Sequence, residues 1–177
     1  MNSYLPEKLN SLLHASRTAI GSSGRGAALE DLVEHVFEGV PSVSLYARDV
    51  KDESGCQEVD LVFAHFFPIS RLPILDVTII IECKNERTKT SAAEVREFGS
   101  KLRTRSMNVG VLVTAAGLSG KRGVAGHSAI RDELSNGTSI IVVIAEELAH
   151  LRNPDDLVVL LTARLNELRT VRGYRSV

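Results

Sequence analysis

The segments EVDLVFA (Glu58–Ala64) and VTIIIECK (Val77–Lys84) decide the fold that this sequence predicts. Their runs of β-branched and other apolar residues predict two buried strands. Asp60 interrupts the first strand, and Glu82 and Lys84 close the second. Because side chains alternate between the two faces of a strand, Glu82 and Lys84 project side by side. The same alternation predicts three sets that each share one face: Val59, Leu61 and Phe63; Asp60, Val62 and Ala64; and Val77, Ile79, Ile81 and Cys83.

Carboxylates inside apolar strands need a partner, because burying an unpaired charge is costly. One explanation is structural: Asp60 or Glu82 forms a salt bridge with Lys84. The other is a site for Mg²⁺ or Mn²⁺, since two carboxylates and a backbone oxygen form the hard-oxygen ligand set that these ions prefer. In that site Lys84 would orient or help to deprotonate a water, or neutralise charge on a phosphate.

Glu30 is a further candidate for the same site. The spacing of apolar residues predicts a helix over Ala27–Glu38 with one buried stripe, and Glu30 lies at the flank of this stripe, about 90° from its centre. This position favours a side chain that leans towards the sheet. The alternative is an exposed acid near a helix N-terminus, where it interacts favourably with the helix dipole.

The remaining patterns predict an α/β fold in which a mixed central sheet carries helices on both faces. The order of elements around the sheet gives an αβββαβ core. We interpret the chain as one domain over residues 1–177, with an N-terminal helix and loop at 1–26, the core at 27–145 and C-terminal helices at 146–177. The predicted elements are helices at Pro6–Ile20, Ala27–Glu38, Ser91–Arg105, about Ser128–Ser135 and from Pro154; strands at Val43–Asp49, Glu58–Ala64, Ile74–Lys84, Val109–Ala115 and Ser139–Ala145; and loops at Gly21–Gly26, His65–Pro73 and Gly117–Gly126.

This arrangement resembles the PD-(D/E)xK nuclease superfamily, in particular its Mrr-like restriction endonuclease branch. The resemblance is carried by Glu30 on a helix, Asp60 in a strand and Glu82-Cys83-Lys84 at the end of the next strand. The predicted order of elements over residues 27–115 is similar to the core of that superfamily. The chain departs from the pattern at Val59, where the superfamily has proline, and in the long spacing between Asp60 and Glu82, which requires an insertion to loop out.

The resemblance implies a restriction-endonuclease-like fold and a catalytic site for Mg²⁺ (or Mn²⁺). Asp60 and Glu82 would bind the ion together with the backbone carbonyl of Cys83, Lys84 would assist the attacking water, and Glu30 would support the site. The implied activity is that of a DNA endonuclease, which hydrolyses phosphodiester bonds by in-line attack of a metal-activated water. The alternative is a catalytically weak or inactive DNA-binding module, or a subunit of a defence or repair complex.

The charge distribution agrees with a local nucleic-acid surface. Lysine and arginine number 21 against 22 acidic residues, and a net charge of −1 argues against DNA binding by bulk charge. Residues 84–131, however, hold ten basic and three acidic residues, a local net of +7, which leaves −8 for the rest. Some of these basic side chains are only exposed to solvent, and we expect the others to contact phosphates. The candidates are Arg96, Lys101, Arg103, Arg105, Lys121 and Arg122.

Other classes of protein fit the sequence less well. No apolar run is long enough to cross a membrane, and the first residues do not resemble a secretory signal. Two cysteines suit a reducing compartment, so we expect a cytoplasmic protein without membrane partners. The loop Gly117–Gly126 lacks P-loop spacing. With no room for a recognition domain, specificity would come from a homodimer or a partner subunit; the leucines of the C-terminal helix would form such a dimer or cover the sheet of their own chain.

Overall fold

Five strands form one mixed sheet in the order β1-β2-β3-β4-β5. The computed structural model describes residues 3–66, 72, 74–120 and 125–174. Neighbouring strands are antiparallel from β1 to β3 and parallel from β3 to β5. The elements are α1 (Pro6–Thr18), α2 (Gly21–Glu38), β1 (Val43–Lys51), β2 (Glu58–His65), β3 (Thr78–Lys84), α3 (Ala92–Thr104), β4 (Val109–Thr114), α4 (Gly126–Ser135), β5 (Ser139–Ile144), α5 (Ala145–Ala149) and α6 (Pro154–Val171).

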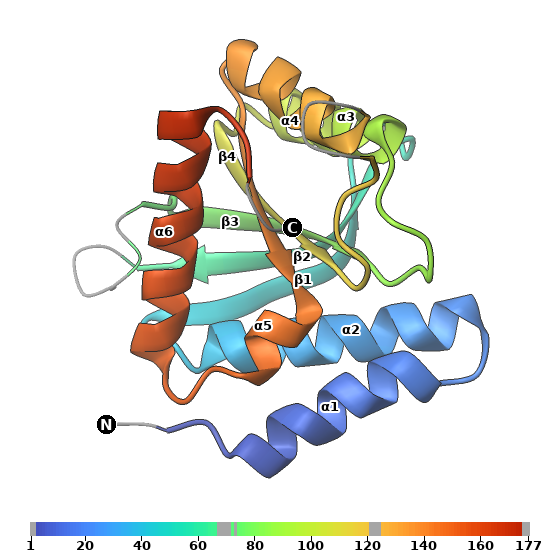
Figure 1. Ribbon diagram of the computed structural model, residues 1–177, viewed down its shortest axis with the longest axis vertical. Coiled ribbons are helices and arrows are strands. Elements are labelled where there is room, and N and C mark those ends of the chain that lie inside the picture. The colour runs from blue at the N-terminus through green and yellow to red at the C-terminus, as the bar shows by residue number, and fades with distance from the viewer. Residues whose placement is uncertain (1–2, 67–71, 73, 121–124, 175–177) are drawn as a thin grey trace.

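Helices cover both faces of the sheet, as the sequence predicts (Figure 1). The connections from β3 to β4 and from β4 to β5 each contain a helix, and these two helices, α3 and α4, pack together on one face. The opposite face is covered by α2, against which α1 and α5 pack, and α6 lies along β5 and contacts α2. None of the helices in the described ranges combines the length and apolarity that a membrane crossing needs.

Two apolar clusters fill the spaces between the sheet and these helices. Phe37 of α2 stacks on Phe63 of β2 with ring centroids 5.4 Å apart. Four leucines of α6 are buried in the chain's own core, so this helix has the second of its two expected roles, covering its own sheet. They are Leu157, Leu161, Leu165 and Leu168.

Two helix starts follow from capping signals in the sequence. The Ser91 hydroxyl accepts a hydrogen bond from the Glu94 N–H, and the Glu94 carboxylate accepts one from the Ser91 N–H, which completes a capping box at α3. At α6 the Asn153 side chain accepts a hydrogen bond from the Asp156 N–H and Pro154 occupies the first turn.

The expected loop at Gly21–Gly26 is wrong, because these residues form the first turns of α2. Glycine disfavours a helix by about 1 kcal/mol per residue, and tertiary contacts outweigh this preference here. The Asn85 side-chain amide donates hydrogen bonds to the carbonyls of Ser16, at 2.8 Å, and Arg25. Glu30 therefore lies in the third turn of α2 rather than near its N-terminus, and the helix-dipole explanation for this acid is excluded.

Strand boundaries also differ from expectation, most of all at the start of β3. β3 begins at Thr78 rather than Ile74, because Leu75 closes a turn with Leu72 and the Asp76 carboxylate accepts a hydrogen bond from the Val77 N–H. Immediately after β5 the chain enters α5, a short helix in the region where C-terminal helices were expected, although only the helix from Pro154 was assigned a start. Most of the expected loop at His65–Pro73 and residues 121–124 of the glycine-rich loop lie outside the described residues.

Alternation is confirmed in β3 and fails at one end of β2. Ile79 and Ile81 pack towards α2, whereas Ile80 packs towards α3. In β2, Leu61 packs towards α2 but Val59 joins the opposite cluster. Pairing between β2 and β3 ends at Leu61 and Ile81, whereas Val59 still pairs with Val50 of β1.

Close packing between α3 and β4 depends on Gly110. A Cβ atom at this position would lie 2.6 Å from Leu102 Cδ1 and 2.9 Å from Phe98 Cζ. We therefore expect Gly110→Ala to lower the free energy of unfolding by about 1–3 kcal/mol in urea denaturation, because overpacking displaces these buried side chains. Gly26→Ala is the matched control. Its Cβ would meet nothing within 4 Å inside α2, and a gain of about 0.5–1 kcal/mol is expected; an equal response of the two variants would contradict the packing argument.

Candidate active site

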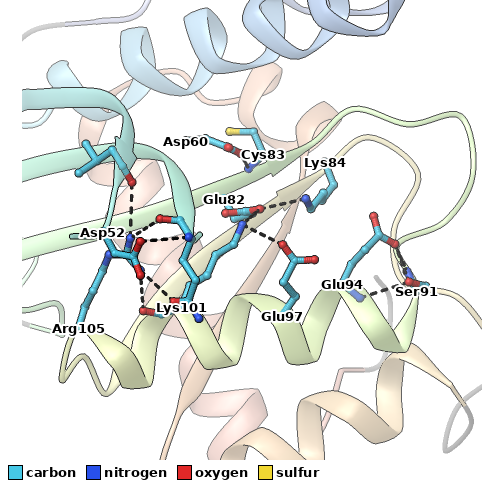
Figure 2. Close-up of polar contacts among 12 residues, drawn as sticks. Asp52, Asp60, Glu82, Cys83, Lys84, Ser91, Glu94, Glu97, Lys101 and Arg105 are labelled. Carbon is cyan, nitrogen blue, oxygen red and sulfur yellow. Dashed lines mark hydrogen bonds and ion pairs between the residues drawn. The ribbon is translucent and has the colours of Figure 1, made fainter. Parts of the chain in front are cut away.

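Glu82 lies at the centre of a buried polar cluster at the end of β3 (Figure 2). Its side chain is only 2% exposed and points towards α3. One carboxylate oxygen, Oε1, lies 2.9 Å from Lys84 Nζ and 2.7 Å from Lys101 Nζ. The other oxygen, Oε2, is buried and has no hydrogen-bond partner among the described residues. A buried acceptor without a partner costs about 1–3 kcal/mol, so this oxygen is placed to receive a ligand that the protein does not supply.

Asp60 lies beside Glu82 where β2 separates from β3. Its Oδ2 accepts a hydrogen bond of 2.6 Å from the Cys83 N–H, taking the place of the strand carbonyl that would otherwise pair there. The N–H and C=O groups of one strand residue point to the same side of the strand. The Cys83 carbonyl therefore faces the edge of β3 where the Asp60 carboxylate lies, whereas the Cys83 side chain packs in the core.

Lys101 belongs to this cluster, although we expected it to contact DNA. It lies on the buried side of α3 with its side chain 8% exposed, and its ammonium group forms ion pairs with Glu82 and, at 3.3 Å, with Glu97. A signal for this position exists in the sequence, because Lys101 follows Phe98 by three residues and so lies on the same helix face. The structure thus contradicts an exposed phosphate-binding role for Lys101, since both its burial and its partners hold it inside the protein.

Glu30 approaches the cluster from the opposite face of the sheet. Its side chain is 15% exposed, and Arg48 of β1 reaches it with 3.8 Å between Arg48 Nη1 and Glu30 Oε2. Burial, followed by the charges of Asp60 and Asp49, raises the pKa of Glu30 to about 7, although Arg48 acts to lower it. Because Asp60 perturbs this carboxyl, Glu30 belongs to the same electrostatic environment as the strand carboxylates.

The carboxylates repel one another and the lysines offset part of that repulsion. Burial and then Glu82 raise the pKa of Asp60 to about 6, against the Cys83 N–H and Lys84, which lower it. Burial acts to lower the pKa of Lys84, but its interaction with Glu82 outweighs this and raises the pKa above the ordinary value. Shifted pKa values that arise from burial and from neighbouring charges are typical of functional sites.

Removing the Asp60 charge should stabilise the metal-free protein at alkaline pH. Folding raises the pKa of Asp60, so the folded protein favours the protonated form of this side chain. The stability that the protonated Asp60 contributes is therefore greatest at low pH and is lost as the pH rises through about 6. Asp60→Asn keeps an acceptor for the Cys83 N–H, so at pH 8 in EDTA we expect a gain of about 1–3 kcal/mol in urea denaturation. At pH 5 the gain should shrink. A variant less stable than the parent at both pH values would contradict the assignment.

The donors present fit a hard divalent cation. Among the described residues no three His, Cys, Asp or Glu side chains converge as a ready metal cluster. The donor set is instead two carboxylates, Asp60 and Glu82, with the Cys83 carbonyl. This set suits Mg²⁺, which binds proteins through one or two carboxylates and keeps several waters. The unpartnered Glu82 Oε2 is the observation that most favours such an ion.

The arginines expected to bind DNA contact other parts of the chain. Arg96 lies 3.3 Å from Asp132 of α4, and Arg103 forms an ion pair with Glu133 of the same helix. Arg105 donates hydrogen bonds to backbone carbonyls of the β1–β2 hairpin. These contacts connect α3 to its neighbours, and DNA binding by the three arginines stays a prediction. The other two candidates, Lys121 and Arg122, lie outside the described residues.

The fold and this site define a restriction-endonuclease-like α/β domain. A family model described as restriction endonuclease, of the Mrr catalytic type, matches residues 24–151. This span exceeds half of the chain, so the protein belongs to the Mrr-type restriction endonuclease family. The matched span contains Glu30, Asp60, Glu82, Cys83 and Lys84. No curated protein sequence gives a significant match.

Proposed function

We propose that this protein is a divalent-metal-dependent DNA endonuclease that hydrolyses phosphodiester bonds with Mg²⁺ or Mn²⁺. The observation that carries the proposal is the pair of strand carboxylates beside the Cys83 peptide, where one oxygen of Glu82 has no partner in the described part of the chain. Membership of the restriction endonuclease family supports it.

Each side chain of the site has a distinct task in this proposal. Asp60, Glu82 and the Cys83 carbonyl hold the cation, which when bound supplies Lewis-acid polarisation of the phosphate and lowers the pKa of water. Lys84 is 22% exposed, and its ammonium group would orient the attacking water and offset phosphate charge. Glu30 supports the site from α2, and Lys101 fixes the orientation of Glu82.

The proposal extends to the surroundings of the reaction. DNA is the substrate, and the cytoplasm is the expected compartment, since both cysteines are free. The described residues form the core and its flanking helices, so we propose that a homodimer or a partner subunit supplies sequence specificity.

Incubation with several DNA forms tests the activity. Supercoiled plasmid, linear duplex, single-stranded and branched DNA are each treated with purified protein in Mg²⁺, in Mn²⁺ and in EDTA. Nicking or linearisation of the closed circle with either ion, and none in EDTA, is expected for an endonuclease. If none of the four substrates is cut with either ion, the proposal fails.

A second candidate is a DNA-binding module without catalytic turnover. The observation that favours it is that Lys84 and Lys101 both form ion pairs with Glu82 and offset its charge. This candidate predicts that DNA affinity persists in Asp60→Ala and that the parent protein never cleaves DNA. Metal-dependent cleavage by the parent excludes it.

A further inference from the structure

A pocket with a volume of about 240 Å³ opens beside the active site and is lined by three arginines. Arg17 comes from the end of α1, Arg25 from α2, and Arg87 from the segment that follows β3. Ala115 and Ala116, which follow β4, leave the space open because their side chains are small. The pocket therefore lies where the parallel strands β3 and β4 end, the edge at which α/β sheets bind their ligands.

Asn85 connects the walls of this pocket to the end of β3, where Lys84 lies. It follows Lys84 directly, lines the pocket, and donates hydrogen bonds to the carbonyls of Ser16 and Arg25. The Lys84 carbonyl also accepts a hydrogen bond of 2.9 Å from the Ala115 N–H. The pocket walls are thus held in a fixed position relative to Lys84.

The charge of the pocket is largely unsatisfied by the protein. Arg25 Nε is buried and makes no hydrogen bond within the described ranges, and a buried donor in that state is costly. Arg87 is exposed and forms no ion pair in the same part of the chain. Arg17 pairs with Glu146 at the surface, with 3.1 Å between the charged atoms, and Glu86 is the one acid among the described residues that line the pocket.

Guanidinium groups of this kind match phosphate. An arginine presents a planar set of donors that binds phosphate oxygens in pairs, and such charge-assisted hydrogen bonds are about twice as strong as neutral ones. Arg87 lies three residues beyond Lys84, at most about 10 Å along an extended chain. Successive phosphates of one DNA strand lie within that reach of a phosphate bound at Lys84.

We infer that this arginine pocket binds a phosphate group of the DNA strand adjacent to the phosphate that is cleaved. The inference rests on the proposed function, which supplies the strand and its position. The ligand is either an internal phosphodiester or a terminal 5′-phosphate, which share the same chemistry.

Binding of fluorescent duplex DNA in Ca²⁺ and in EDTA, without cleavage, tests the pocket. Arg25→Gln and Arg87→Gln should each weaken binding about tenfold and lower the slope of log affinity against log salt concentration by about 0.9, the value for one lost phosphate contact. Arg169→Gln on the exposed surface of α6 is the control with the same change of charge, and its affinity should equal that of the parent. If all three variants bind equally, the inference is overturned.

Two further measurements separate the possible outcomes. Thermal melting shows whether Arg25→Gln is folded, and because Arg87 is exposed, Arg87→Gln keeps the test valid even if Arg25→Gln unfolds. Equal losses of affinity on circular DNA and on linear duplex identify an internal phosphodiester, whereas a loss only on 5′-phosphorylated ends identifies a terminal phosphate.

Because affinity is measured without turnover, a parent that binds but does not cleave refutes the proposed activity alone. A parent that cleaves while the pocket variants bind normally refutes the pocket alone.

Discussion

Glu82→Gln is expected to lower the rate of metal-dependent DNA cleavage about 10³-fold or more. The change removes the charge of a side chain that is 2% exposed and whose Oε2 has no partner among the described residues, so the substitution acts directly on the proposed cation site. Losses of this size are typical when one element of electrostatic stabilisation is removed from an active site. Asp60→Asn should have a similar effect, because it removes the second carboxylate of the same site. Single-turnover cleavage of a labelled duplex gives the rates.

Calorimetric titration measures the affinity of the same variants for Mn²⁺. Both variants should lose cation binding together with cleavage. Glu53→Gln in the β1–β2 hairpin is the matched control, since it removes an exposed carboxylate that is not one of the proposed ligands and should leave both properties unchanged. Full Mn²⁺ affinity in Glu82→Gln would show that Glu82 does not hold the ion.

Replacing Lys84 and Lys101 by methionine should separate catalysis from stability. Both lysines contact Glu82 Oε1, but Lys84 is 22% exposed and Lys101 is 8% exposed. Lys84→Met should lower the cleavage rate about 10²–10⁴-fold, the range for a residue that acts on the transferred proton or its water, while the protein stays folded. Lys101→Met should lower the free energy of unfolding by about 1–3 kcal/mol, because the buried charge of Glu82 loses one of two partners.

Cleavage rates and urea denaturation curves are compared for the two variants. In each, the remaining lysine still contacts Glu82, so neither change leaves the carboxylate wholly unpaired. A larger loss of cleavage in Lys101→Met than in Lys84→Met, at unchanged stability, would assign the catalytic task to Lys101 instead.

Much of the site could be predicted from local patterns. Alternation placed Glu82 and Lys84 on one face of β3, and Lys84 does contact Glu82. Of the two explanations that the sequence left open, the salt bridge is present at Glu82 Oε1. Glu82 Oε2 has no partner among the described residues, and the metal site stays a proposal. The capping box at Ser91 also gave the start of α3, because its two hydrogen bonds are local.

Features that depend on contacts between distant segments could not be predicted in this way. Asn85 extends α2 into a glycine-rich segment by binding the Arg25 carbonyl, and no pattern within residues 21–26 contains that information. The end of the β2–β3 ladder at Leu61, beyond which the Asp60 carboxylate binds the Cys83 N–H, likewise depends on the partner strand. The sequence does not distinguish the role of Lys101 from that of the other basic residues of α3, because this role depends on its contact with Glu82 of β3.

A structure of crystals soaked in Mn²⁺, with anomalous diffraction recorded at the manganese edge, tests the central claim most directly. We predict an anomalous peak among the Asp60 carboxylate, the Cys83 carbonyl and Glu82, and its absence from crystals of Asp60→Asn. A protein that cleaves DNA with Mn²⁺ but shows no peak there at the same concentration would contradict the claim that these residues hold the catalytic ion.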